Sequence, residues 1–495
     1  MAKKKLFEKQ WIQVLILFVI GIVFFFCLGQ EWSVIEKDSQ FYLYPTMRNS
    51  GVMPLYPLFL FGVRCLFGEG LYIDAAVVVQ SLIAIACTMA FVLYLQNIFR
   101  LRFVETILCF LFTMLPFSIE LPRVWITHQI MTESIVYSLI YIFFIFVLQY
   151  VFCKKIQWLL GVTGLAVLMG LIRSQLVFLL IVTAILFVCV EFMKDKERRK
   201  KIGIRLVKAI GNLCIGAICA CISVLIIYQL RACYLTYAVP VISRIEQKAE
   251  AAQDETKGES NGETSEIEKT ETQMADSMSQ MTHLIVIRGF YEADEEDVML
   301  FDTSEMQEIF RRTYAATDEL HYRYVYARQD LYMWQDLVKD EIIGVANGEI
   351  RAYLNENPDV SLDAAQAVRE LGMKVLLRHF GRYLYHVIRL MISGFISSVF
   401  FQVGRIYFLC HIITLLLFAI DVVGVIYCMR NREDKKAALF ALVTVGFIVM
   451  MVGIINLVFI GLQRYMVYAM GIFYCSLYLL LKEWGLPWIK KILKF

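Results

Sequence analysis

The sequence predicts an all-α polytopic membrane protein with about ten transmembrane helices. Of its 495 residues, 59% are hydrophobic and 19% are charged, and the mean hydropathy is +0.62. A soluble protein of this size has too little interior to bury that much apolar surface, so most of it must face lipid. The hydrophobic residues also gather into runs of roughly 20, the length at which a helix crosses a bilayer.

Ten apolar runs are long enough to count as spanning helices, the shorter ones within a bundle. The first run follows a lysine-rich start and ends without an A-x-A cleavage site, so we interpret it as an uncleaved anchor. The expected spans cover residues 11–29, 72–96, 104–119, 132–152, 157–172, 174–192, 207–230, 406–428, 436–460 and 464–483.

Basic loops set the expected orientation. With ten spans, KDKERRKK (194–201) and RNREDKK (430–436) lie on the same side as both termini, which the positive-inside rule assigns to the cytoplasm. Residues 385–404 are an eleventh candidate, but counting them as a span would move RNREDKK outside, and we expect an interfacial helix there. The protein is therefore expected in the plasma membrane, with cytoplasmic termini and its site on the extracytoplasmic face.

Three parts make up the expected domain organisation. Residues 1–230 form a membrane module whose first outer loop covers 30–71, residues 231–384 an extracytoplasmic segment, and residues 385–495 the interfacial helix and last spans. Within the middle part, 245–280 is acidic and Ser/Thr-rich, which indicates a disordered linker. The region 283–340 regains aromatic and arginine residues and predicts a small, mostly helical domain.

Charged and aromatic residues recur at the outer ends of the expected spans. Two acids follow the first span, a histidine and a glutamate precede the fourth, one arginine separates two spans, and Arg-Tyr opens the last. The candidate site residues are Glu36, Asp38, Tyr42, Tyr56, His128, Glu133, Arg173, Arg464 and Tyr465.

Arginines and acids on one rim suit a charged headgroup, because guanidinium forks bind phosphate and carboxylates transfer protons or bind metals. Simpler interpretations remain open for each position. Asp38 and Glu36 also fit a solvated loop, and Glu133 fits a helix start that Thr132 caps. Arg173 fits an arginine that snorkels to the interface.

The segments DSQFYL…GVMPLYPLFL, TESIVYSL, LIRSQLVFLL and QRYMVYA, in this order, resemble the GT-C superfamily of membrane glycosyltransferases. The resemblance is greatest to bacterial relatives of protein O-mannosyltransferases and lipid A aminoarabinose transferases, and covers about 1–230 and 375–485. It implies a GT-C-like fold. It also implies transfer of a hexosyl or pentosyl group from a polyprenyl-phosphate donor to an extracytoplasmic acceptor, which is a cell-envelope glycan, a lipid or a protein.

The resemblance also implies roles for individual residues. Asp38 would be the catalytic base or a metal ligand, Glu36 completes an E-x-D pair, and Arg464 would contact the lipid-linked phosphate. Many relatives have adjacent Asp and Glu where Ser39 follows Asp38 here, so Glu133 is a candidate for the second carboxylate. Mg²⁺ or Mn²⁺ between Glu36, Asp38 and phosphate is chemically reasonable. The residues expected to bind substrate are Tyr42, Tyr56, His128, Arg173, Arg464 and Tyr465.

Other functional classes are less consistent with the sequence. It contains no P-loop, GxSxG motif or Cys/His zinc spacing. A net charge of +3, without a basic stripe interleaved with aromatics, argues against a nucleic-acid partner. The main alternative is a transporter or flippase of polyprenyl-linked glycans, for which Asp421 is the principal ionisable residue within a span. In a third interpretation, a structural or assembly subunit, the rim acids would be dispensable.

Overall fold

The structure is a computed structural model of the whole chain. It describes the following residues: 2–29, 32–35, 39–43, 52–118, 125–197, 202–242, 244, 280–320, 331–360, 362–400, 407–432, 434–458 and 463–492.

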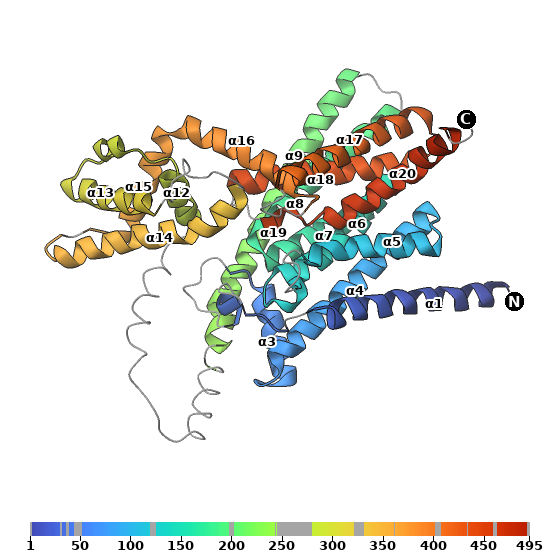
Figure 1. Cartoon of the computed structure of the whole chain (residues 1–495), viewed down its shortest axis with the longest axis horizontal. Helices are drawn as coiled ribbons and strands as arrows, with labels where there is room; N and C mark the ends of the chain where they lie inside the picture. Colours follow the sequence, from blue (N-terminus) through green and yellow to red (C-terminus); the bar gives the residue numbers. More distant parts are fainter. Residues whose placement is uncertain are drawn as a thin grey trace.

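These residues form a helical bundle with a smaller group of helices at one end (Figure 1). The smaller group, called the head below, consists of α12 to α15, and α16 connects it to the bundle. Helix α1 begins, and helix α20 ends, at the end of the bundle that lies away from the head. The isolated β-bridge found in the described ranges joins Val34 to Gln129.

The bundle helices of the first half alternate long apolar elements with short turns. They are α1 (Ala2–Ile22), the π-helix η1 (Val23–Cys27), α2 (Gln40–Leu43), α3 (Leu55–Phe67), α4 (Tyr72–Phe99), α5 (Phe103–Met114), η3 (Leu115–Ser118), η4 (Ile126–His128), α6 (Glu133–Cys153), α7 (Ile156–Ile172), η5 (Ser174–Val177), α8 (Phe178–Glu197), α9 (Ile202–Cys233) and the π-helix η6 (Tyr234–Ala238).

The second half begins with the head and returns to the bundle. Its helices are α12 (Gln280–Phe290), η7 (Glu295–Leu300), α13 (Ser304–Glu319), α14 (Leu331–Glu356), α15 (Ala364–Arg378), α16 (Phe380–Ser397), α17 (Tyr407–Asn431), α18 (Lys436–Val458), α19 (Gln463–Met466) and α20 (Met470–Ile492).

Seven helices in the described part are long and apolar enough to cross a membrane, which confirms the expectation of an all-α protein of membrane type. These candidate spans are Gln10–Cys27, Tyr72–Phe99, Glu133–Cys153, Ser174–Lys194, Val207–Ile242, Phe408–Asn431 and Lys436–Leu457. The expected spans at 104–119 and 157–172 coincide with shorter apolar helices, Phe103–Ser118 and Ile156–Ile172.

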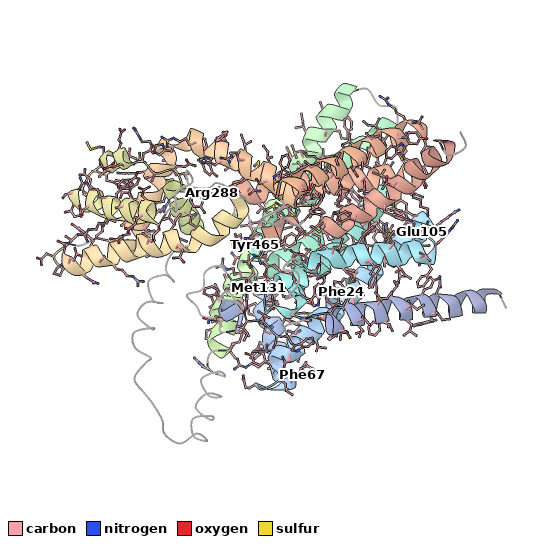
Figure 2. All side chains as sticks on the ribbon, in the orientation of Figure 1. Phe24, Phe67, Glu105, Met131, Arg288 and Tyr465 are labelled. Carbon is pink, nitrogen blue, oxygen red and sulfur yellow. The ribbon has the colours of Figure 1, made fainter. Side chains whose placement is uncertain are left out.

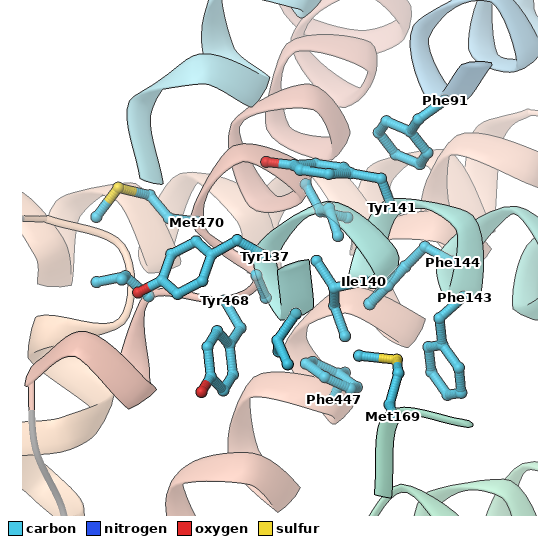
Figure 3. Close-up of a cluster of buried hydrophobic side chains, with 14 of the residues drawn as sticks. Phe91, Tyr137, Ile140, Tyr141, Phe143, Phe144, Met169, Phe447, Tyr468 and Met470 are labelled. Atoms are coloured by element: carbon cyan, nitrogen blue, oxygen red, sulfur yellow. The ribbon is translucent and has the colours of Figure 1, made fainter. Parts of the chain in front are cut away.

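Helix α6 lies at the centre of the bundle. It packs against α4, α7 and α18, and 67% of its apolar stretch is buried, compared with 17% for the first helix. Figure 3 shows aromatic side chains of α6, Tyr137 and Tyr141 among them, packed with Phe447 of α18 and Met169 of α7. Because α6 is fixed from all sides, it is a rigid support for the residue at its first position, Glu133.

Helix α9 is longer than a bilayer requires. The apolar stretch Val207–Ile242 has 36 residues, and a helix of that length is about 54 Å long, against a hydrocarbon core of about 30 Å. An apolar helix of excess length is accommodated by tilting. Accordingly, α9 crosses the neighbouring bundle helices at a steep angle (Figure 1).

The head has a hydrophobic core of its own, formed by α12 to α15. Helices α12 and α15 approach at backbone contact, because both carry glycine at the crossing. A Cβ on Gly289 would lie 2.5 Å from the Gly372 carbonyl oxygen, and a Cβ on Gly372 would lie 2.6 Å from the Val286 Cα. Side chains at these two positions would therefore push the helices apart.

Two helices have boundaries that differ from the expected ones: the last long helix, and α16, which covers Phe380–Ser397 where a helix over 385–404 is expected. The last long helix begins at Met470, not at 464, and Arg464 lies in the short α19 before it. The hydroxyl of Tyr137 donates a hydrogen bond to the backbone carbonyl of Arg464, which gives this carbonyl a partner outside its own helix. Helix α16 contributes Leu390 to the head core and Met391 and Phe395 to the bundle core, so it belongs to both parts. The expected linker lies outside the described residues except for Gln280.

Candidate functional site

The candidate site lies at the end of the bundle that faces the head. It is built from the start of α6, the break between α7 and η5, and the short α19. Figure 2 shows Met131 and Tyr465 in this region, with Arg288 of the head beyond them. Three of the residues predicted from the sequence, Glu133, Arg173 and Arg464, meet here as side chains.

Glu133 is the centre of the site. Its side chain is fully buried, its Oε2 lies 2.5 Å from Arg173 Nη1, and its Oε1 lies 3.3 Å from Arg464 Nε. The Thr132 hydroxyl donates a hydrogen bond of 2.9 Å to Oε2, so Thr132 binds the carboxylate and makes no side-chain cap of α6. Within the described residues, Oε1 accepts no aligned hydrogen bond. One carboxylate oxygen thus retains capacity for a further donor.

Arg173 has an extended backbone conformation, which interrupts the helical path between α7 and η5. Its Nη1 donates to the Thr132 hydroxyl at 2.6 Å, and its Nε donates to Gln175 Oε1 at 2.9 Å. Burial disfavours its charge, but the Glu133 carboxylate and the surrounding tyrosines together outweigh burial and raise the pKa of Arg173 above its ordinary value. Arg173 is therefore a permanently charged partner of Glu133.

Arg464 is the more exposed of the two arginines, with 25% of its side chain accessible compared with 11% for Arg173. Its Nη1 faces the Met131 sulfur at 4.0 Å, and its Nη2 faces the Tyr465 hydroxyl at 3.4 Å. A thioether and a phenol are poor acceptors compared with a phosphate oxygen. The guanidinium of Arg464 is thus suited to an incoming anion.

Tyr465 is buried between the two arginines. The Arg173 Cζ lies 4.5 Å from the centroid of its ring, and the Arg464 Cζ lies 5.4 Å from it. Both guanidinium groups are therefore within the range of cation–π attraction. Two arginines and one glutamate give the cluster a net charge of +1, which favours an anionic ligand.

The predicted residues Tyr42 and Tyr56 are near the cluster but on different elements. Tyr56 of α3 is buried, interacts electrostatically with Glu133, and packs edge-on against Tyr42 at a centroid distance of 5.2 Å. Tyr42 also lines a small pocket that is open to solvent. The other residues that line this pocket are Leu43, Pro57, Leu60, Phe61, Arg64, Tyr72 and Ile242.

His128 is buried and packs against the end of the first helix. Its Nε2 donates a hydrogen bond of 2.8 Å to the Phe25 carbonyl oxygen in the π-helix η1, and its ring contacts Trp32. A Cβ on Gly29 would lie 2.7 Å from the ring. The structure therefore gives His128 a role in anchoring the first helix, and its contact with a substrate stays a prediction.

Glu36 and Asp38 lie outside the described residues, but the chain just before them is held near the site. Val34 N donates to the His128 carbonyl at 2.8 Å, and Ile130 N donates to the Val34 carbonyl at 3.1 Å. This short bridge ties the start of the first outer loop to the segment that leads into Glu133.

Gln80 is a residue of this region that the sequence analysis missed. It is buried in α4, accepts a hydrogen bond of 2.7 Å from the Tyr56 hydroxyl, and donates to the carbonyls of Thr127 and Gln129 at 3.0 and 3.3 Å. Gln80 thus holds the segment that pairs with Val34. The available signal was a single amide inside the apolar run AAVVVQSLIAIA.

A divalent metal does not fit the described part of the site. Glu133 is flanked by two guanidinium groups, which would repel a cation, and the described residues contain no group of three His, Cys, Asp or Glu side chains with metal-binding geometry. The proposed ligands Glu36 and Asp38 are not among the described residues, so Mg²⁺ or Mn²⁺ at that pair stays a prediction.

No family model, curated protein or solved structure matches the chain.

Proposed function

We propose that this protein is a GT-C-type glycosyltransferase that moves a sugar from a polyprenyl-phosphate donor to an extracytoplasmic acceptor. The observation that carries the proposal is the buried carboxylate of Glu133 between the guanidinium groups of Arg173 and Arg464. Burying a charged cluster in an apolar bundle is costly, and such clusters in membrane proteins commonly mark functional sites.

The charge and exposure of the cluster support a phosphate as its ligand. Arg173 is engaged with Glu133, Thr132 and Gln175, whereas the side chain of Arg464 is the more exposed of the two, at 25% compared with 11%. A guanidinium fork binds phosphate oxygens through charge-assisted hydrogen bonds. We therefore assign the donor phosphate to Arg464 and the support of the site to Arg173.

The membrane setting supports a lipid-linked donor. The site lies at one end of an apolar bundle, and the start of α1 and the end of α20 lie at the opposite end (Figure 1). The proposal includes ten spans, with α5, α7 and α20 added to the seven candidate spans, cytoplasmic termini, and a head outside the plasma membrane. A donor held by its lipid tail would then present its phosphate to the rim where Arg464 lies.

The proposed reaction forms one bond and breaks another. The acceptor hydroxyl attacks the anomeric carbon of the donor sugar, its proton passes to Asp38, and the bond between the anomeric carbon and the phosphate oxygen breaks. Polyprenyl phosphate leaves with the electron pair of that bond, and the arginines stabilise its added charge. Asp38 is assigned from the sequence and lies outside the described residues; Val34, four positions before it, is bridged to Gln129 in the segment that leads into Glu133.

The test uses the purified full chain in lipid nanodiscs, with a panel of sugars linked to polyprenyl phosphate. We expect release of polyprenyl phosphate from one class of donor. Asp38→Asn should lower the rate by about 100- to 10,000-fold, the usual contribution of a general base, and leave donor binding largely intact. Arg464→Gln should instead weaken donor binding, because the phosphate loses a charged partner.

Arg311→Gln is the matched control for Arg464→Gln, because Arg311 is an exposed arginine of the head that pairs with Glu308. It should bind and turn over the donor like the wild-type protein. The proposal is wrong if the wild-type protein neither binds nor cleaves any donor in the panel, or if Asp38→Asn works at the wild-type rate.

The alternative, a flippase or transporter of polyprenyl-linked glycans, is supported by a different residue. Asp421 lies in the middle of α17, is 2% exposed, and its Oδ1 accepts no hydrogen bond within the described residues. An intramembrane acid of this kind is compatible with a transport pathway. Movement of labelled donor across sealed vesicles, abolished by Asp421→Asn and unaffected by Asp38→Asn, would favour this alternative.

A further inference from the structure

Arg288 of the head reaches into the end of a bundle helix. Its side chain is 9% exposed, and its Nη1 and Nη2 donate hydrogen bonds of 2.8 Å each to the carbonyls of Leu457 and Asn456. Tyr383 of α16 contacts the same guanidinium, and its hydroxyl donates to the Leu457 carbonyl at 3.3 Å. The head is thereby attached to the last turn of α18.

The chemistry of this contact is that of a helix C-terminus. The last four carbonyls of an α-helix lack partners within the helix, and a cation there interacts favourably with the helix dipole. Asn456 and Leu457 belong to the last turn of α18, which ends at Val458. Arg288 therefore supplies the terminal hydrogen bonds of α18 from another part of the chain.

The end of α18 leads directly to the candidate site. Arg464 follows Leu457 by seven positions, a tether of at most about 25 Å even when fully extended. Helix α16, which carries Tyr383, also packs against α19, the helix of Arg464. The head thus acts on Arg464 from two directions, through the end of α18 and through α16.

We infer that Arg288 is a positioning residue for Arg464, so that docking of the head controls how tightly the site holds an anionic headgroup. The identity of that headgroup rests on the proposed function, but the positioning itself does not. Arg173 is held by Thr132 and Gln175 near α6 and α7, so head docking should affect Arg464 and leave Arg173 in place.

The experiment compares the wild-type full chain with Arg288→Met, which keeps an unbranched apolar stem but removes the guanidinium donors. Hydrogen–deuterium exchange is measured over peptides from α18, α19 and α6, and binding is measured with polyprenyl phosphate. We expect exchange at the last turn of α18 and at α19 to rise about tenfold, and affinity for polyprenyl phosphate to fall about tenfold. Exchange in α6 and in the head core should not change.

Two further variants keep the test decisive. Lys374→Met removes a head cation that pairs with Asp302 and Glu370 and should behave like the wild-type protein. Arg288→Lys retains the charge without the fork and should show an intermediate effect; if Arg288→Met fails to fold, this variant decides. Unchanged exchange at α19, or a rise confined to the head, would overturn the inference. Failure of the wild-type protein to bind polyprenyl phosphate would instead contradict the proposed function. The exchange data would still test whether Arg288 positions Arg464.

Discussion

At the scale of single residues, the site is a carboxylate with two unequal partners. Arg173 has three polar partners and is 11% exposed, whereas Arg464 contacts Glu133 through Nε and directs its Nη groups toward Met131 and Tyr465. On the basis of this difference, we assign the structural role to Arg173 and the ligand-binding role to Arg464. Arg173 compensates the buried charge of Glu133, and the more exposed Arg464 is the more accessible to a ligand.

This inequality predicts opposite effects for two matched substitutions. Arg173→Gln should destabilise the protein by about 3–5 kcal/mol, because it leaves the buried Glu133 with too little compensation. Arg464→Gln should cost clearly less stability and mainly reduce binding of polyprenyl phosphate. Thermal unfolding in detergent, with binding assayed on the same samples, measures both.

The double variant Glu133→Gln with Arg173→Gln serves as the control, because it removes both charges of the buried pair. It should recover part of the stability lost in Arg173→Gln. If Arg173→Gln and Arg464→Gln proved equally stable and equally impaired in binding, the division of roles would be wrong.

The sequence predicted the residues of the site better than their contacts. Glu133, Arg173 and Arg464 were chosen because each lies at the end of an apolar run, and such ends lie close together on the rim of a bundle. Their ion pairs join residues 40 and 331 positions apart, beyond what local patterns reveal. The contact of His128 with the Phe25 carbonyl depends on the π-helix η1, which no apolar periodicity predicts.

At the scale of elements, the crossing of α12 and α15 provides a test of the head. Gly372→Ala places a methyl group against the α12 backbone and should destabilise the head by about 1–3 kcal/mol, as overpacking of a close contact does. Gly344 of α14 is also helical, but a Cβ there meets no atom within 4 Å. Gly344→Ala should therefore stabilise the head by about 0.5–1 kcal/mol. Limited proteolysis of the full chain, calibrated by thermal melts, compares the stability of the head in the two alanine variants.

Equal sensitivity of the two alanine variants to protease would contradict the close crossing. Both substitutions change the same residue type in a helix of the same unit, so intrinsic helix propensity cancels between them. The difference that remains reports the contact between α12 and α15.

Apolar runs predicted the bundle helices well because length and hydrophobicity are local properties. Deviations occur where a tertiary contact decides the boundary. The last long helix begins at Met470, not at 464, where the Arg464 carbonyl bonds to Tyr137 of α6. Helix α3, at Leu55–Phe67, lies within the expected first outer loop at 30–71, and Pro54 and Pro57 lie at its start, where proline is tolerated.

At the scale of the whole molecule, the head and bundle are joined by long-range contacts that the sequence could not predict. Arg288 and the carbonyls it binds are 168 and 169 positions apart, and its segment carries no motif that indicates a helix-end partner. The resulting arrangement places a separate helical unit beyond the end of the bundle where Tyr465 lies (Figure 2).

The central claim is that the cluster of Glu133, Arg173 and Arg464 binds the phosphate of a polyprenyl-phosphate lipid. The most direct measurement is an experimental structure of the full chain in nanodiscs with bound polyprenyl phosphate. The account predicts phosphate density about 3 Å from the Nη groups of Arg464, with Arg173 still paired to Glu133. Density at another place, for example beside Arg64 in the pocket next to Tyr42, with the Glu133–Arg464 contact unchanged, would contradict it.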